Sequence, residues 1–229
     1  TVAEYSGGEN LEVMEEAVNY NRFLLSLIRS HASREQKILD FGAGIGTFAS
    51  ALAKEGYSIR CVEADERQAQ SIAAKGIPVA RSLDAISNES VDYVYTLNVL
   101  EHIEDDSAIL RDCQRKLVPG GNILIYVPAF QVLYSSMDKK VGHFRRYTIG
   151  DLSRKVCQAG FRVKEASYVD SLGFFASLLF KFAGNNSGDL NRKALIAYDR
   201  LLFPVSRMID AAFKRTFGKN VLVVAARED

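Results

Sequence analysis

The sequence has few of the residues that mark a disulfide framework or a metal centre. Its 229 residues include only three cysteines and three histidines. Cys61, Cys113 and Cys157 are far apart, no pair has CxxC spacing, and an odd number argues against a set of disulfides. The histidines are equally scattered, so no metal-ligand cluster is visible and we expect no metal.

An excess of charge is also missing, as is a hydrophobic run long enough to cross a membrane. The formal net charge of +1 gives no overall basic field, so we expect no nucleic-acid partner. The most apolar run, 172–182, contains Lys181 and is too short to span a bilayer. The first residues are polar and acidic, unlike a signal peptide. We expect a cytoplasmic protein, with the inner face of the membrane as an alternative location.

Strand and helix patterns alternate along the chain, and 48% of the residues are hydrophobic, enough for a sizeable core. The predicted strands cover 37–41, 58–63, 78–80, 91–97, 122–127, 161–168 and 220–226. The predicted helices cover 11–31, a segment after residue 47, 66–75, 105–117, 149–159, 172–182 and a stripe over 201–213. This alternation predicts an α/β fold with a doubly wound, mostly parallel sheet. The last strand is expected to add antiparallel to the sheet edge.

The domain organisation follows from the same pattern. We expect a helical cap over residues 1–32 and one large domain over 33–229. Within that domain, 129–148 is a long connection with aromatic, basic and histidine residues, and loops of this length are usually functional. An apolar helical insertion is expected at about 171–216, with a polar break over 184–192.

A glycine-rich turn follows the first strand, where residues 38–47 read Ile-Leu-Asp-Phe-Gly-Ala-Gly-Ile-Gly-Thr. Glycine has no side chain, so such a turn brings the backbone close to a ligand. Asp40 precedes the first glycine, and Glu63 ends the next strand about twenty residues downstream. A carboxylate at that strand end can accept both hydroxyls of a ribose. The pattern therefore suits a ligand with an ammonium group and a ribose.

Dinucleotide-binding folds are the alternative, because they also place an acidic residue at that strand end. Their fingerprint is Gly-x-Gly-x-x-Gly. Here the third glycine, Gly46, comes one residue early, and Thr47 stands at the last position. The turn alone fits two cofactor classes. An NAD(P)-dependent oxidoreductase stays open on this evidence, although no Tyr-x-x-x-Lys site is visible, and a plain turn is a third interpretation.

Residues 38–47 resemble motif I of class I S-adenosylmethionine-dependent methyltransferases. Asn98-Val99-Leu100-Glu101-His102-Ile103 resembles the family's segment after the fourth strand, and 117–121, Leu-Val-Pro-Gly-Gly, resembles its turn before the fifth. The resemblance implies a seven-stranded, Rossmann-like sheet with an antiparallel last strand. It also implies S-adenosylmethionine as methyl donor, with S-adenosylhomocysteine as product. The residues then expected to contact the cofactor are Tyr20, Asp40, Gly42, Ala43, Gly44, Gly46, Glu63, Ala64, Ser82, Leu83, Asn98 and Val99.

A narrower resemblance covers more of the chain. Residues 142–148, Gly-His-Phe-Arg-Arg-Tyr-Thr, are similar to a loop of one bacterial methyltransferase subgroup often associated with glycosyltransferases. It implies O- or N-methylation of a small or lipid/glycan-linked acceptor. One departure is Asp170, which stands where the subgroup has asparagine. A cofactor-binding module without catalysis is a further alternative.

An acceptor that must lose a proton calls for a general base. His143 is the first candidate, because it lies in the long connection and imidazole titrates near neutrality. His102 is the second. Either histidine could instead have a structural role, fixing the loop or lining the pocket. The expected acceptor contacts are Tyr134, Arg145, Arg146 and Tyr147. Arginine can hold a carboxylate or phosphate, although these two could instead pair with Asp138 or Asp151.

The C-terminal helices are unusually apolar, above all over 172–180. They could pack on the sheet, form a homodimer interface, line a hydrophobic acceptor pocket or contact a membrane surface. Arg200, Arg207, Lys214 and Arg215 flank the later apolar stripe, as in helices that lie on a membrane surface.

Overall fold

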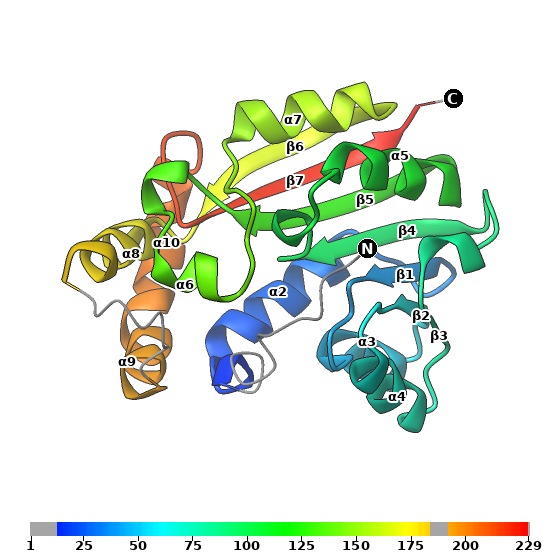
Figure 1. Ribbon diagram of the computed structural model, residues 1–229, viewed down its shortest axis with the longest axis horizontal. Coiled ribbons are helices and arrows are strands. Elements are labelled where there is room, and N and C mark those ends of the chain that lie inside the picture. Colours follow the sequence, from blue (N-terminus) through cyan, green and yellow to red (C-terminus); the bar gives the residue numbers. More distant parts are fainter. Residues whose placement is uncertain (1–12, 184–191, 229) are drawn as a thin grey trace.

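A computed structural model describes residues 13–183 and 192–228, and Figure 1 shows its central sheet. The seven strands are β1 (Lys37–Phe41), β2 (Ser58–Val62), β3 (Val79–Ala80), β4 (Val91–Leu97), β5 (Leu117–Pro128), β6 (Phe161–Val169) and β7 (Asn220–Arg227). They pair in the order β3-β2-β1-β4-β5-β7-β6, and β7 runs antiparallel to the other six. The predicted α/β fold, a doubly wound and mostly parallel seven-stranded sheet, is confirmed.

Helices cover both faces of the sheet. On one face lie α2 (Val18–Ser30), α3 (Thr47–Lys54) and α4 (Glu66–Ala74), and on the other α5 (Asp106–Lys116) and α7 (Ile149–Gln158). The strands alternate between the two resulting cores. In β7, for example, Val221 and Val223 pack with α5 and α7, whereas Leu222 and Val224 pack with α2 and α3.

The sequence predicted that the last strand lies at the edge of the sheet, and this position was wrong. Instead β7 inserts between β5 and β6, pairing antiparallel with both. Its first seven residues are all buried, whereas β6 exposes Arg162, Lys164 and Glu165. A strand that is covered on both faces and paired along both sides is the more apolar of the two, so the exposed β6 forms the edge.

Two predicted boundaries were also wrong. The sequence Leu-Val-Pro-Gly-Gly at 117–121 does not separate α5 from the next strand, because α5 ends at Lys116 and β5 begins at Leu117. Gly120 has a φ of +73°, and the register with β4 shifts between Val91 and Tyr93, so this turn is a bulge at the start of β5. The predicted helix over 11–31 is interrupted at Ala17, and its first two residues lie outside the described part of the chain.

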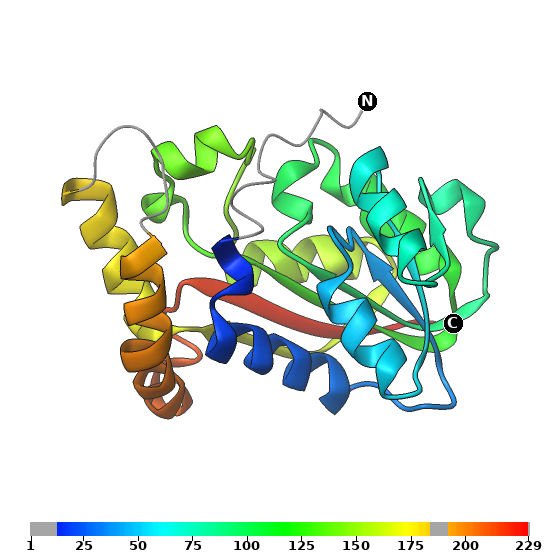
Figure 2. The same cartoon turned by 90° about the horizontal axis from the view of Figure 1, so that it is seen from below.

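The long connection and the C-terminal helices gather beyond the carboxyl ends of the parallel strands (Figures 1 and 2). The connection contains the short helices η3 (Gln131–Leu133) and α6 (Ser136–Lys140). The C-terminal group contains α8 (Ser171–Ala183), α9 (Arg192–Ala197), the π-helix η4 (Tyr198–Leu202) and α10 (Phe203–Phe213). The predicted polar break falls outside the described residues, except for Arg192, which begins α9. Within 13–183 and 192–228, no helix is long and apolar enough to cross a membrane.

Candidate active site

The carboxyl ends of the strands carry unusual backbone conformations. Asn98 and Asp170 directly follow β4 and β6, Phe130 is the second residue after β5, and their φ angles are +54°, +63° and +58°. Residues other than glycine rarely adopt this region, and such strain concentrates at functional sites. Ligands of open α/β sheets bind at this same edge. The backbone therefore points to a site beyond β4, β5 and β6.

The glycine turn lies at this edge, between β1 and α3. The Gly42 amide donates to the carbonyl of Val62 at 2.9 Å, and the residue has a φ of +77°. A Cβ atom on Gly42 would collide with both methyl groups of Val99, which follows β4. Only glycine lets the turn approach β4 this closely. The predicted cofactor residues Gly42 and Val99 are thus brought into contact.

Glu63 is the acidic partner of this turn. One of its carboxylate oxygens accepts from the Gly44 amide at 2.7 Å, and the other accepts from the Asp65 amide at 2.9 Å. Burial raises the pKa of Glu63, against the effect of these amides. Each oxygen keeps a further lone pair. The carboxylate is fixed beside the glycine turn and can still accept two hydroxyl groups, which fits a ribose.

Asp40 lies inside β1 and is 3% exposed. Burial raises its pKa to about 7, although the Tyr95 hydroxyl donates to it at 2.7 Å. No cation accounts for this buried carboxyl among the described residues, and a nearby positive charge would favour its ionised form. The methionine part of S-adenosylmethionine carries an ammonium group, so these residues fit that cofactor.

The other predicted cofactor residues differ in their position relative to this turn and in their exposure. Ala43 donates to Val62 at 3.3 Å, and Gly46 precedes α3 as its N-cap. Ala64 is exposed, and its carbonyl accepts from Arg81. Ser82 is exposed, whereas Leu83 is buried in the short helix η1 (Leu83–Ala85).

Tyr20 comes from α2 and lies edge-on to Tyr126 and Phe203, with ring centroids 6.3 and 5.6 Å apart. Burial raises its pKa to about 12. These ring contacts bring the α2 face against β5 and α10.

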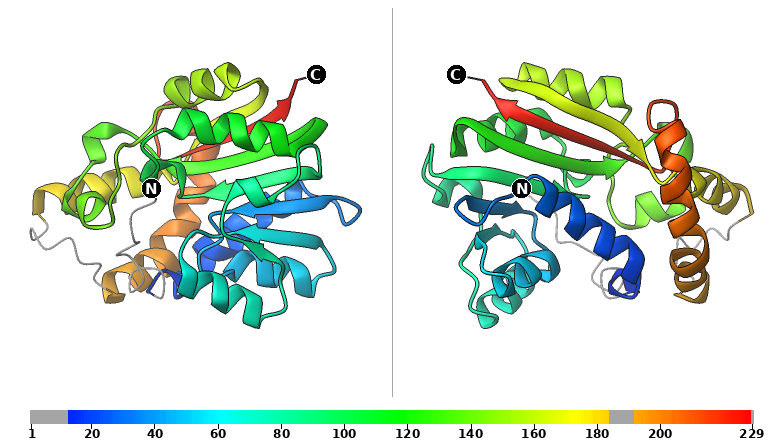
Figure 3. Two further views of the ribbon diagram at one scale, coloured as in Figure 1. Left: turned by 45° about the vertical axis from the view of Figure 1, so that its right-hand side comes forward. Right: turned by 180° about the vertical axis from the view of Figure 1, so that it is seen from behind.

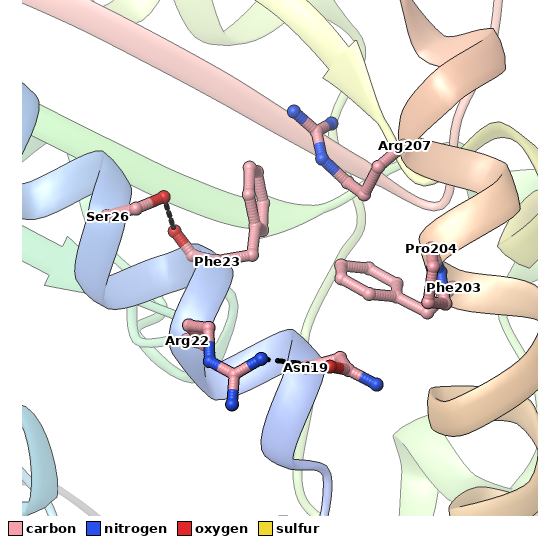
Figure 4. Close-up of a pocket in the computed structure, with 7 residues that line it drawn as sticks. All are labelled: Asn19, Arg22, Phe23, Ser26, Phe203, Pro204 and Arg207. Atoms are coloured by element: carbon pink, nitrogen blue, oxygen red, sulfur yellow. Dashed lines mark hydrogen bonds between the residues drawn. The ribbon is translucent and has the colours of Figure 1, made fainter.

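A separate cavity of about 320 Å³ lies between α2 and α10 (Figure 4). The Arg207 guanidinium lies 3.9 Å from the centre of the Phe23 ring there, and it also pairs with Asp210. None of the residues lining this cavity was predicted as a site residue, and we assign it no role.

The candidate catalytic residues converge beyond β4. The short helix η2 (Leu100–His102) carries Glu101 and His102, and the long connection brings in His143. One ligand atom from each of the three lies within 4.8 Å of the others. The Phe144 amide donates to the Glu101 carbonyl at 2.8 Å, which ties the connection to η2. The histidines look scattered in the sequence, but His102 and His143 meet in the fold.

Asp138 orients His143. The His143 Nδ1 atom lies 2.7 Å from one carboxylate oxygen of Asp138. Arg146 donates to this oxygen at 2.8 Å and to the second carboxylate oxygen at 3.0 Å. Burial alone would raise the pKa of Asp138, but the hydrogen bonds from His143 and Arg146 hold it well below its usual range. An ionised Asp138 accepts a proton-bearing Nδ1, so Nε2 of a neutral His143 carries the lone pair.

The other two members of the cluster are shifted by burial. Burial raises the pKa of Glu101 to about 8, and burial together with His143 lowers the pKa of His102 to about 4. The Glu101 side chain is 0% exposed. Near neutral pH, His102 is therefore uncharged, and Glu101 is poised between its two forms.

The predicted acceptor contacts are largely used inside the chain. Arg146 pairs with Asp138, one of the two internal partners considered from the sequence. Arg145 and the Tyr147 hydroxyl both bind Asp106, at 2.8 and 2.7 Å. Tyr134 donates to the His143 carbonyl at 2.6 Å. These four side chains hold the connection in place around His143.

Sequence reasoning missed the importance of Asp138 and Glu101. Asp138 was considered only as an arginine partner, and Glu101 only as a helper that orders the loop. The signal for Asp138 was its position five residues before His143, since the turn of α6 brings the two side chains together. The sequence carries no comparable signal for Glu101, because its contacts come from a loop forty residues away.

Comparisons with known proteins place the chain in a family. A profile of the methyltransferase-domain family matches residues 14–166. The ubiquinone biosynthesis O-methyltransferase of Parvibaculum lavamentivorans is 23% identical over 181 residues, 69% of this chain and 70% of that protein. The protein of the same name from Caulobacter sp. (strain K31) is 29% identical over 99 residues, and the match spans only 39% of its length.

Solved structures share the fold. A chain from the complex between the Haloferax volcanii Trm112 methyltransferase activator and its methyltransferase matches 97% of this chain and 95% of its own, with a TM-score of 0.67 and 16% identity. An S-adenosylmethionine-dependent methyltransferase from Mesorhizobium loti matches 88% of this chain and 96% of its own, with a TM-score of 0.59 and 18% identity.

The chain belongs to the methyltransferase-domain family and is a class I S-adenosylmethionine-dependent methyltransferase. This membership decides between the two cofactor classes that the glycine turn left open, in favour of S-adenosylmethionine. It also decides against the oxidoreductase and the module without catalysis.

Proposed function

We propose that this enzyme methylates a hydroxyl or amino group of a small molecule whose reactive atom lies beside Glu101, His102 and His143. The observation that carries this proposal is the Asp138–His143 pair, which directs His143 Nε2 toward the other two residues. The cluster follows β4, as does Val99, which packs on the glycine turn. Relatives named as O-methyltransferases support an oxygen acceptor.

The cofactor supplies an electrophilic methyl group on a positively charged sulfur that is already a good leaving group. The protein's part is then to position the acceptor and to remove its proton. Glu63 and the glycine turn would hold the ribose, and Asp40 would favour the ammonium end. His143, fixed by Asp138, is the residue that we propose to activate the acceptor. Neutral His102 and the buried Glu101 would form the rest of the acceptor pocket.

Replacing His143 tests this role. His143→Ala should lower turnover at least about 100-fold, since general base catalysis typically contributes a factor of this size. S-adenosylhomocysteine affinity should change little, because His143 belongs to the connection after β5 and not to the glycine turn that would hold the cofactor. The matched control is His31→Ala, which removes the histidine at the far end of α2. Unchanged turnover in His143→Ala would disprove the assignment.

The surface of the C-terminal helices favours a lipid-linked acceptor reached at a membrane surface. Leu179, Phe182, Leu201 and Met208 are each more than two thirds exposed. Throughout the described part of 171–216, the exposed charged residues are all basic, namely Lys181, Arg192, Lys193, Arg200, Lys214 and Arg215. Apolar side chains surrounded by basic residues suit an anionic lipid surface. These helices lie beyond the same strand ends as the cluster (Figure 3).

Vesicle flotation tests this surface. The protein should float with vesicles rich in phosphatidylglycerol and much less with phosphatidylcholine vesicles. The double variant Leu179→Ser/Met208→Ser should lose most of the flotation, whereas Val18→Ser, an exposed apolar residue on α2, should not. Absence of flotation removes the membrane proposal. A homodimer in sedimentation that the double variant abolishes would assign the surface to a second copy instead.

A further inference from the structure

The buried carboxylate of Glu101 is the least satisfied charged group in the cluster. Its side chain is 0% exposed, and neither oxygen accepts a hydrogen bond from another residue in the described part of the chain. Burying an ionised carboxylate without a partner is costly, so such groups are normally paired or bind a metal. The Arg146 guanidinium, whose charge acts on Glu101, is already bound to both oxygens of Asp138.

The histidine that faces Glu101 makes no hydrogen bond with it. His143 Nε2 lies 3.9 Å from the nearer Glu101 oxygen, too far for a hydrogen bond. Since Nδ1 is the atom that meets Asp138, Nε2 of a neutral His143 presents a lone pair to the carboxylate. Two electron-rich atoms that face one another at this separation leave room for a cation between them.

His102 completes the arrangement from a third side. Its ring lies at 78° to that of His143, with centroids 4.5 Å apart, and it hydrogen-bonds the backbone of Val141. Two ligand atoms about 2.1 Å from one ion lie roughly 3 to 3.5 Å apart. The three atoms here lie within 4.8 Å of one another, so a pair at that limit needs to close by roughly 1.3 to 1.8 Å. They come from η2 and one loop, and the Phe144–Glu101 backbone bond already holds these two segments together.

We propose that Glu101, His102 and His143 bind one divalent transition-metal ion. The residue types agree with this, since two imidazoles and one carboxylate suit zinc, iron or manganese. Asp138 acts as the outer carboxylate that fixes His143, an arrangement typical of histidines that ligate metals. Three protein ligands leave positions open for another molecule, as in catalytic rather than structural sites.

This inference rests on the proposed function and changes the part that His143 plays in it. With an ion bound, His143 Nε2 would be a ligand and not the general base, and the ion would activate the acceptor. An ion at this position would take an acceptor hydroxyl and lower its pKa, so that its proton passes to solvent water. The oxygen would then form a bond to the methyl carbon while the carbon–sulfur bond breaks and its electron pair stays on sulfur. The acceptor class is therefore a hydroxyl compound rather than an amine.

Binding of Co²⁺ to the full chain, after removal of bound metal with a chelator, tests the site directly. Calorimetry and the visible absorption of Co²⁺ should both show one ion per chain. Glu101→Gln, His102→Gln and His143→Gln should each weaken the affinity at least about 100-fold, and Asp138→Asn about 10- to 100-fold. His31→Gln is the control and should bind Co²⁺ as the wild type does, because it removes the remaining histidine of the chain.

Binding of S-adenosylhomocysteine, measured on the same samples, separates the possible failures. Retained binding shows that a variant is folded, so its loss of Co²⁺ reports on the site. If the wild type binds the nucleoside but no Co²⁺, or if Glu101→Gln binds Co²⁺ as tightly as the wild type, the metal inference is overturned and the proposed function stands. If the wild type fails to bind the nucleoside, the proposed function itself fails.

Discussion

At the scale of single residues, burial sets the charge of the groups that the site uses. Asp40, Glu63 and Glu101 all have a raised pKa because they are buried, while Asp138 has a lowered pKa because His143 and Arg146 bind it. A raised carboxyl pKa means that the ionised carboxylate lowers the stability of the folded protein, and a bound cation would reverse this effect. The site thus destabilises the free protein in return for affinity toward positive ligands.

Asp40 gives the clearest test of this cost. Its folded pKa of about 7 lies above the value near 3.9 of an unfolded chain, so the folded state holds the proton more tightly. The free energy of unfolding should therefore fall as pH rises from about 4 to about 7. Asp40→Asn should remove this loss, and at pH 8 it should raise the free energy of unfolding by roughly 2–4 kcal/mol.

Urea unfolding at pH 4 and pH 8, without cofactor, measures this difference. Near pH 4 the variant and the wild type should be nearly equal, because Asp40 is then protonated in the folded state and still about half protonated in the unfolded chain. Asp112→Asn, which alters a surface carboxylate on α5, should show no such dependence. An effect of Asp40→Asn that is equal at both pH values would contradict the assigned cause.

At the scale of elements, distant carboxylates cap two helices. The N-cap residue of α2, Ala17, has no side-chain cap, and instead Asp199 of η4 accepts from the Asn19 and Tyr20 amides at 3.0 and 2.8 Å. Asp210 of α10 does the same for the start of α8, through the Asp170 and Ser171 amides. These bonds attach the C-terminal helices to the part of the fold that carries Tyr20.

Asp199→Ala should lower the free energy of unfolding by about 2 kcal/mol, because two helix amides lose a charged acceptor. Hydrogen exchange at the Asn19 and Tyr20 amides should speed up more than exchange in the middle of α2. Asp112→Ala serves as the control, since that carboxylate pairs only locally with Arg115. Unchanged exchange at the start of α2 would show that the cap is not what holds it.

These caps also show where sequence reasoning ends. Local patterns predicted most strands to within a residue or two, since each strand is buried on one or both faces. The start of α2 was missed because its cap comes from a residue 180 positions away. Likewise, the place of β7 beside β5 depends on the path of the whole C-terminal segment. The spacing of residues along the chain does not predict contacts between segments that are far apart in the sequence.

The candidate site divides in the same way. Asp40 and the three glycines lie close together in the sequence, and Glu63 follows the next strand, so their pattern could be recognised in the sequence. His102 and His143 are forty-one positions apart, and only the path of the connection after β5 shows that they meet Glu101. Arg145 and Tyr147 looked available for an acceptor in the sequence, because their shared internal partner, Asp106, is about forty positions away on α5.

At the scale of the whole molecule, the candidate cofactor residues and the candidate catalytic residues lie along one edge of the sheet. The glycine turn after β1, Glu63 after β2, the cluster after β4 and the connection after β5 all lie at the carboxyl ends of parallel strands (Figure 1). The C-terminal helices extend from this edge. A cofactor on one side and an acceptor on the other would therefore meet between the glycine turn and His143.

Calorimetry with S-adenosylhomocysteine tests this account most directly. The wild type should bind one molecule per chain, and it should not bind NADH. Glu63→Ala should weaken the binding at least about 10-fold, since a bidentate hydrogen-bonding carboxylate is lost, while Glu66→Ala, an exposed neighbour on α4, should not. Binding of NADH in place of S-adenosylhomocysteine, or equal affinity in Glu63→Ala, would contradict the account.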